Sequence, residues 1–309
     1  MNTDVVFLKN KRIGLIYGGL SSERAVALKG FKAVEQALKG MKLKHFKFDL
    51  NEKSKRNVFA FVNRSKLDVI FLMLHGRFGE DGTIQGGLDF LGVPYIGSSA
   101  VASAVAMDKV VSKQVMLANR ISTPEYEIVE KGKVPGLKLP FVAKPAVGGS
   151  TIGISIVKKH SGIKKAVKEA FRFCDKVLVE KYIAGREITV PIFEDKALEI
   201  IEIIPKTAFY DYKAKYVKGM SLHIMPAKLP AVVYKKAQAL ALKVHRVLGL
   251  KDFSRIDIII GKNGKLFVLE ANTLPGLTGT SLLPEAAKYA GLSFADMTAR
   301  MLRMALRKK

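Results

Sequence analysis

The strongest chemical signal in the chain is a predicted hairpin near its C-terminus that carries acidic residues on both strands. Asn263-Gly264 is typical of a two-residue hairpin turn, so the flanking strands should pair residue for residue. This register places Asp257 opposite Glu270, with Arg255 and Asn272 as a neighbouring pair on the same face. Two carboxylates across a ladder repel by about 0.2–1 kcal/mol unless a cation lies between them.

The simplest cation for this face is Mg2+, because Asp257, Glu270 and Asn272 offer only oxygen atoms and no histidine or cysteine is nearby. Mg2+ held by few protein ligands usually also holds substrate phosphates, which implies a nucleotide site. The alternative is an exposed hairpin face whose acids are merely solvated. This stretch alone leaves both interpretations open.

The chain that surrounds this hairpin follows an α/β pattern of three lobes. Residues 11–97 alternate apolar strands with amphipathic helices, as in a parallel α/β unit. Its strands are expected over 12–17, 43–48 and 68–74, and its helices over 22–39 and 54–65.

The remaining residues predict two further lobes. The first has helices on either side of Met107-Asp-Lys109 and strands over 141–144, 154–157 and 177–180. The second has strands over 187–193 and 197–204, a helix over 231–248, the acidic hairpin and terminal helices. The predicted domains are therefore 1–97, 98–185 and 186–309.

Composition limits the class of protein. The chain has 309 residues, of which 49% are hydrophobic, and no apolar run reaches the roughly 18–20 residues that span a bilayer. It lacks a secretory signal pattern, so we expect a cytoplasmic protein without a membrane partner. The single cysteine, Cys174, ends an apolar helical pattern and is expected to be a buried structural thiol.

The formal net charge of +25 raises the question of nucleic acid binding. The lysines, however, are spread through every segment, without an arginine-rich arm or interleaved aromatic residues. We therefore expect no nucleic acid partner.

Three loops could meet a ligand. Residues 17–23 follow a strand and open a helix, where backbone N–H groups favour anions, although the spacing is not a dinucleotide fingerprint. Glu23 there fits either a helix-dipole preference or a ligand. Residues 144–153 join two strands, so they are not a Walker loop, but their glycines could fold over phosphates beside Lys144. Residues 207–226 fit either a lid or a mobile surface loop.

Taken together, these features resemble the D-alanine–D-alanine ligases of the ATP-grasp superfamily over nearly the whole chain. The stretches that carry the resemblance are Tyr17-Gly-Gly-Leu-Ser-Ser-Glu-Arg24, Leu74-His-Gly-Arg-Phe-Gly-Glu-Asp-Gly-Thr-Ile-Gln-Gly86, Met107-Asp-Lys109, Phe209-Tyr-Asp-Tyr-Lys-Ala-Lys-Tyr216 and Leu269-Glu-Ala-Asn-Thr-Leu-Pro-Gly276. The resemblance implies a three-lobed ATP-grasp fold and a homodimer. It also implies that ATP phosphorylates the carboxylate of one D-alanine, whose acyl phosphate the amine of a second attacks to give a dipeptide for peptidoglycan.

The same resemblance implies a role for particular residues. Asp257, Glu270 and Asn272 would hold two Mg2+ or Mn2+ ions. The residues that would bind ATP are Lys109, Lys144 and Lys215 on the phosphates, Glu180 and the backbone of Lys181 to Ile183 on adenine, and Glu187 on the ribose.

The resemblance also implies how the amino acids are held. Glu23 would bind the ammonium of the first D-alanine with His75 nearby, and Ser281 and Leu282 would meet the carboxylate of the second. Arg255 and the Gly276 N–H would stabilise the oxyanions that form. Ser150 and Tyr216 would link to Glu23 and close the flap and the lid.

The sequence departs from the family at one position, and several alternative functions remain open. Gly148 stands where these ligases usually have a glutamate, which predicts a looser flap. Ligases that use D-serine or D-lactate as second substrate are the nearest rivals, and Tyr216 argues against D-lactate because those enzymes carry a histidine in that region. An inactive scaffold that binds nucleic acid is disfavoured by the intact metal ligands.

Overall fold

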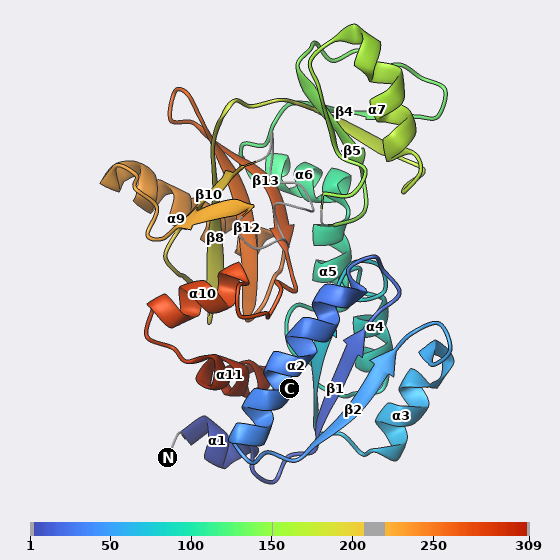
Figure 1. The fold of residues 1–309 in the computed structure, drawn as a ribbon, viewed down its shortest axis with the longest axis vertical. Helices are drawn as coiled ribbons and strands as arrows, with labels where there is room; N and C mark the ends of the chain where they lie inside the picture. Colours follow the sequence, from blue (N-terminus) through green and yellow to red (C-terminus); the bar gives the residue numbers. More distant parts are fainter. Residues whose placement is uncertain (1–2, 150, 207–219, 308–309) are drawn as a thin grey trace.

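The computed structural model describes residues 3–149, 151–206 and 220–307, which form three sheets with their covering helices (Figure 1). The first sheet is parallel, in the order β2-β1-β3, as expected for the N-terminal residues. Its strands are β1 (Ile13–Gly18), β2 (His45–Leu50) and β3 (Val69–Leu74), and its helices include α2 (Arg24–Gly40), α3 (Val58–Arg64) and α4 (Thr83–Phe90). Every residue of β3 is buried, which explains its unbroken apolar run.

The two ends of the chain share the core of this first lobe. Helix α11 (Phe294–Leu306) packs against α1 (Thr3–Leu8), α2 and β3, and its Met297, Met301 and Leu302 lie in the same apolar cluster as the parallel strands (Figure 1). Arg303 also forms an ion pair with Asp4. The last helix therefore fastens the C-terminal segment to the N-terminal lobe.

The second sheet is antiparallel, in the order β4-β7-β5-β6, with α7 (Ile163–Ala170) against it. Its strands are β4 (Tyr126–Val129), β5 (Phe141–Pro145), β6 (Ser155–Val157) and β7 (Val177–Lys181).

The prediction that Cys174 ends a helix and is buried was wrong. Helix α7 stops at Ala170, and the thiol beyond it is partly buried against the cluster of Val110, Ala146 and Leu178.

Two helices lead into this lobe and meet at Asp108, as predicted. These are α5 (Ala100–Met107) and α6 (Lys109–Ala118), and the Asp108 carboxylate caps α6 by accepting the N–H groups of Val110 and Val111. Both helices contribute to the apolar core of the third sheet, so the first turn of α6 is brought to the end of the acidic hairpin.

The third sheet is antiparallel, in the order β11-β10-β8-β12-β13, with β9 paired to β8. The strands are β8 (Gly185–Phe193), β9 (Lys196–Ala197), β10 (Ile201–Pro205), β11 (Ser221–Ile224), β12 (Phe253–Gly261) and β13 (Leu266–Asn272). Helices α9 (Ala231–Val247) and α10 (Leu282–Tyr289) accompany them. The single strand expected over 197–204 is divided between β9 and β10.

The β12–β13 hairpin has the predicted register at its acidic end, although its turn is not the predicted one. The loop has three residues, since the Gly261 N–H donates to the Lys265 carbonyl, and Gly264 takes a φ of +74°. The strands consequently begin one residue out of the expected register. A bulge at Leu269 corrects the shift, so Asp257 faces Glu270 as expected.

Among the described residues, no helix combines the length and the apolar character needed to cross a bilayer.

Candidate active site

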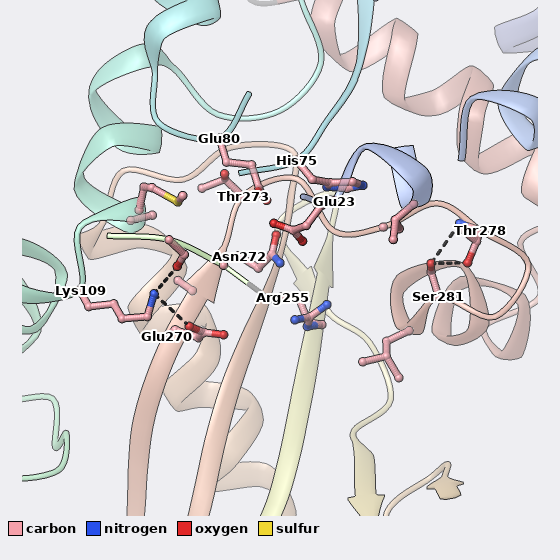
Figure 2. Close-up of a pocket in the computed structure, with 18 of the residues that line it drawn as sticks. Glu23, His75, Glu80, Lys109, Arg255, Glu270, Asn272, Thr273, Thr278 and Ser281 are labelled. Atoms are coloured by element: carbon pink, nitrogen blue, oxygen red, sulfur yellow. Dashed lines mark hydrogen bonds and ion pairs between the residues drawn. The ribbon is translucent and has the colours of Figure 1, made fainter. Parts of the chain in front are cut away.

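A polar pocket lies at the ends of the strands where the first lobe meets the third sheet (Figure 2). Every described residue expected to bind D-alanine or stabilise the reaction lines this pocket: Glu23, His75, Arg255, Gly276, Ser281 and Leu282. Lys109, Glu270 and Asn272 line it as well. Residues that are more than 250 positions apart in the sequence are thus brought to one cavity.

Glu23 and His75 come from the carboxyl ends of neighbouring parallel strands. Glu23 follows β1 at the start of α2, and His75 directly follows β3, so both side chains emerge at the same edge of the sheet. Both are buried. Burial lowers the pKa of His75, and the Arg255 charge lowers it further, although Glu23 acts in the opposite direction. His75 is therefore a neutral imidazole at physiological pH.

Glu80 is a pocket residue that the sequence analysis did not single out. Its buried carboxyl accepts the Gly76 N–H at 2.6 Å. Burial and then the nearby Glu23 raise the pKa of Glu80 to about 8. Because Glu80 lies within the Leu74–Gly86 stretch, the family-like motif marked the segment but not this side chain.

The acidic face of the hairpin carries charges that are already paired. Arg255 donates to both oxygens of Asp257, at 3.1 Å each, and Thr189 donates to Asp257 Oδ1 at 2.6 Å. Glu270 Oε2 lies 3.6 Å from Lys109 Nζ. The two carboxylates that face each other across the ladder are each balanced by a cation.

Asn272 supplies the observation that bears on metal binding. Its Oδ1 is buried and accepts no hydrogen bond from any of the residues that the structure describes. Such an atom is costly unless a ligand occupies it. An oxygen beside two carboxylates suits Mg2+, so the donor set fits the predicted ion. Within the described ranges no group of three or more His, Cys, Asp or Glu side chains is placed to bind a metal, so the amide or a substrate must complete any site.

The glycine-rich flap between β5 and β6 lies over one side of the pocket. Lys109 Nζ donates to the Gly148 carbonyl at 2.5 Å (Figure 2). A Cβ built on Gly149 would lie 3.1 Å from Glu23 Oε2, so the flap backbone approaches the substrate end of the pocket closely. Ser150, expected to link to Glu23, lies outside the described residues.

The opposite wall is the turn before α10. Thr278 donates its backbone N–H to Ser281 Oγ at 3.0 Å, and the two hydroxyl oxygens are 2.8 Å apart. A Cβ on Gly276 would lie 2.9 Å from Ser281 Oγ, so a side chain there would require the Ser281 hydroxyl to move. The turn thereby brings hydroxyl groups and the start of α10 to the pocket, an arrangement suited to an anion.

A second pocket lies between the second and third sheets. It is lined by Glu180, Lys181, Ile183 and Glu187, which are expected to bind adenine and ribose. Lys144, expected on the phosphates, and Asp257 line it as well. Glu180 Oε1 accepts a hydrogen bond from Lys144 Nζ at 2.5 Å. Glu270 lines both pockets, so they meet at this carboxylate.

Two further predicted residues cannot be placed. Lys215 and Tyr216, together with most of the expected lid over 207–226, lie outside the described residues. The described end of that tract forms β11 at the edge of the third sheet.

The three lobes and the pocket between the second and third sheets define an ATP-grasp fold. Two family models match the chain, "D-ala D-ala ligase N-terminus" over residues 47–98 and "D-ala D-ala ligase C-terminus" over residues 103–303. Two curated relatives are named D-alanine--D-alanine ligase. That of Geotalea uraniireducens (strain Rf4) is 46% identical and covers 96% of each chain, and that of Trichlorobacter lovleyi is 46% identical and covers 93% of this chain and 92% of its own.

The solved structures agree with the sequence comparisons. The crystal structure of D-alanine--D-alanine ligase from Bacillus anthracis complexed with ATP has a TM-score of 0.84 at 34% identity, over 96% of this chain and 97% of that one. The chain belongs to the D-alanine–D-alanine ligase family.

Proposed function

We propose that this chain joins two D-alanine molecules to D-alanyl-D-alanine, a peptidoglycan precursor, with the hydrolytic energy of one ATP. The observation that carries the proposal is that Glu270 lines both pockets. A nucleotide in one pocket would direct its γ-phosphate to Glu270, where an amino-acid carboxylate in the other pocket can meet it. The relative from Bacillus anthracis was solved with ATP, which supports this assignment of the nucleotide.

In the proposed nucleotide pocket, Glu180 and the backbone of Lys181 to Ile183 hold adenine, and Glu187 holds the ribose. Lys144 and Lys109 contact the phosphates, and Lys215 is expected to join them from outside the described residues. Asp257, Glu270 and Asn272 would hold Mg2+, which neutralises phosphate charge when bound. For Asn272, the support is that its buried Oδ1 has no hydrogen-bond partner among the described residues.

In the first chemical step, an oxygen of the first D-alanine carboxylate attacks the γ-phosphorus, and ADP leaves. Glu23 holds the ammonium of this substrate, beside the neutral His75. The carboxylate of the substrate then points toward Glu270. Arg255 and the Gly276 N–H stabilise the charge that develops on oxygen. The flap with Ser150 and the lid with Tyr216 would exclude the water that hydrolyses the acyl phosphate.

In the second step, the deprotonated amine of the second D-alanine attacks the acyl carbon, and phosphate leaves. Ser281 and Leu282, at the start of α10, receive the carboxylate of this substrate. We also infer a homodimer from the family, and a cytoplasmic location from the need for ATP. No observation favours D-serine or D-lactate as second substrate, and Tyr216, which bears on D-lactate, is among the residues the structure does not describe.

ADP release tests the proposal directly when D-alanine, D-serine, D-lactate and L-alanine are offered singly and in pairs. We expect release with D-alanine alone and a dipeptide product by mass spectrometry. Release that depends on D-serine or D-lactate would reassign the second subsite. No release with any of the four would overturn the proposed activity.

A further inference from the structure

Lys113 is a completely buried lysine on the same face of α6 as Lys109, one turn further along. Its Nζ lies 2.9 Å from Glu180 Oε2 and also donates to the Thr123 hydroxyl. The ammonium sits over the Tyr126 ring, 5.3 Å from its centroid. A lysine is almost never fully buried unless a paired charge stabilises it, and Glu180 is that charge.

Glu180 is thereby held from two sides. Lys144 takes Oε1 and Lys113 approaches Oε2, so the carboxylate lies between two ammonium groups. Glu180 and Lys144 line the nucleotide pocket, whereas Lys113 lines neither pocket. Glu180 is therefore the pocket residue through which Lys113 acts most directly on a bound nucleotide.

The charges around Glu180 determine its protonation. Burial alone would raise the pKa of Glu180, but Lys144 and then Lys113 overcome this effect and hold the pKa below its usual range. Burial lowers the pKa of Lys113 to about 8, with Glu180 acting against it and Lys144 and Lys109 acting with it. Lys113 is thus charged at neutral pH and, after Lys144, favours the ionised form of Glu180.

The ionisation state of Glu180 matters for the choice of base. An ionised carboxylate only accepts hydrogen bonds, whereas a protonated one can also donate. Adenine presents an amino group where guanine presents a carbonyl oxygen. An ionised Glu180 therefore suits adenine and repels guanine, and a protonated Glu180 would lose that discrimination.

We propose that Lys113 is a positioning residue that sets the preference for ATP over GTP by holding Glu180 as a carboxylate that can only accept. The proposal rests on the proposed function in one respect, namely that Glu180 faces the base of the nucleotide. Glu180 contacts the base in the pocket, and Lys113, outside the pocket, controls which base Glu180 accepts.

Equilibrium binding of ATP and GTP, measured by calorimetry without D-alanine at pH 6 and pH 8.5, tests this role. The variants are Lys113→Met and Lys113→Gln, the second of which keeps a hydrogen-bonding group of similar length if the first does not fold. Thr123→Val is the matched control, because it removes the other partner of Lys113 and leaves its charge. Circular dichroism verifies the fold of each variant.

We expect the wild-type protein and Thr123→Val to share one ATP-to-GTP affinity ratio. In Lys113→Gln the ratio should fall by about tenfold or more at pH 6. It should recover partly at pH 8.5, because the higher pH ionises Glu180 again. A ratio in Lys113→Gln equal to that of the wild type, even with weaker binding of both nucleotides, would overturn the proposal. Normal ATP binding without ADP release would instead refute the ligase assignment and leave the role of Lys113 intact.

Discussion

Lys109 Nζ, in the first turn of α6, lies 3.6 Å from Glu270 Oε2 on β13 and donates to the Gly148 carbonyl in the flap (Figure 2). One buried ammonium thus connects the central helices, the acidic hairpin and the flap. In the proposed reaction a phosphate group of ATP would compete with Glu270 for this ammonium. Binding of the nucleotide would then free Glu270 to bind a metal ion. At the same time it would change the hydrogen bond by which Lys109 holds the Gly148 carbonyl of the flap.

Glu270→Gln should abolish ligation without unfolding the protein. The substitution removes a charge from the proposed metal site and relieves repulsion with Asp257, while the lost pair with Lys109 is partly exposed and offsets little. We expect ADP release to fall at least about 1,000-fold, with a melting temperature close to that of the wild type. The control is Glu169→Gln, in an exposed pair with Arg172 on the far lobe, which should retain full turnover. Wild-type turnover in Glu270→Gln would refute the metal assignment.

Asn272→Ala tests the same metal site by removing its uncharged ligand. The buried amide oxygen has no hydrogen-bond partner in the described part of the chain, so its removal relieves a cost of about 1–3 kcal/mol and the apo protein should lose no stability. The Mg2+ concentration that gives half-maximal ADP release should rise about tenfold or more, by analogy with the loss of one ligand. A lower melting temperature combined with an unchanged Mg2+ requirement would mean that Asn272 is structural.

Glu80 should make the stability of the protein depend on pH in a distinctive way. Its folded-state pKa of about 8 exceeds the value in the unfolded chain, so the folded state binds more protons between the two values. Its contribution therefore favours folding at low pH and is lost as the pH rises toward 8.

Glu80→Gln should remove this dependence, because the neutral amide can still accept the Gly76 N–H. Relative to the wild type, the variant should gain a few kcal/mol in free energy of unfolding between pH 5 and pH 9. Urea unfolding at pH 5, 7 and 9 measures the difference. Parallel curves for the two proteins would show that Glu80 is ionised throughout.

Gly148 should resist substitution for a conformational reason. Its φ of +132° is rarely adopted by residues with a side chain, although a Cβ there would meet no atom within 4 Å. The glutamate usual in the family could not be introduced here without a change in the flap backbone. Glycine at this position therefore also permits a backbone conformation that other residues rarely adopt, besides loosening the flap. This strain would disturb the bond from Lys109 to the Gly148 carbonyl.

Gly148→Ala and Gly148→Glu should therefore both raise the KM for ATP, by about fivefold or more for a strain of 1–3 kcal/mol. Gly279→Ala is the control, because a Cβ at that glycine also meets nothing and its φ is not in the left-handed range. A KM in Gly148→Ala equal to that of the control would show that the flap accommodates a side chain freely.

The hairpin shows how far the sequence could predict this site. The pairing of Asp257 with Glu270 was predicted from a two-residue turn, yet the turn has three residues and a bulge at Leu269 restores the pairing. Local patterns determine which residues share a face, but the length of a glycine-containing turn is not determined by them.

The residues that were missed owe their importance to tertiary burial. Nothing local distinguishes the buried Lys113 from the exposed lysines of the chain, and Glu80 acquires its raised pKa from burial and then from Glu23. The packing of α11 on the N-terminal lobe was missed for a similar reason. An amphipathic pattern predicts an apolar face but not its partner.

We expect an acyl phosphate to form where the two pockets meet at Glu270. This intermediate can be tested with D-alanine whose carboxylate carries 18O in both positions, followed by mass spectrometry of the phosphate released with ADP. We expect one 18O atom in each phosphate, because the carboxylate oxygen that attacks the γ-phosphorus leaves with it. Phosphate without label, released at the same rate as dipeptide, would rule out the acyl phosphate.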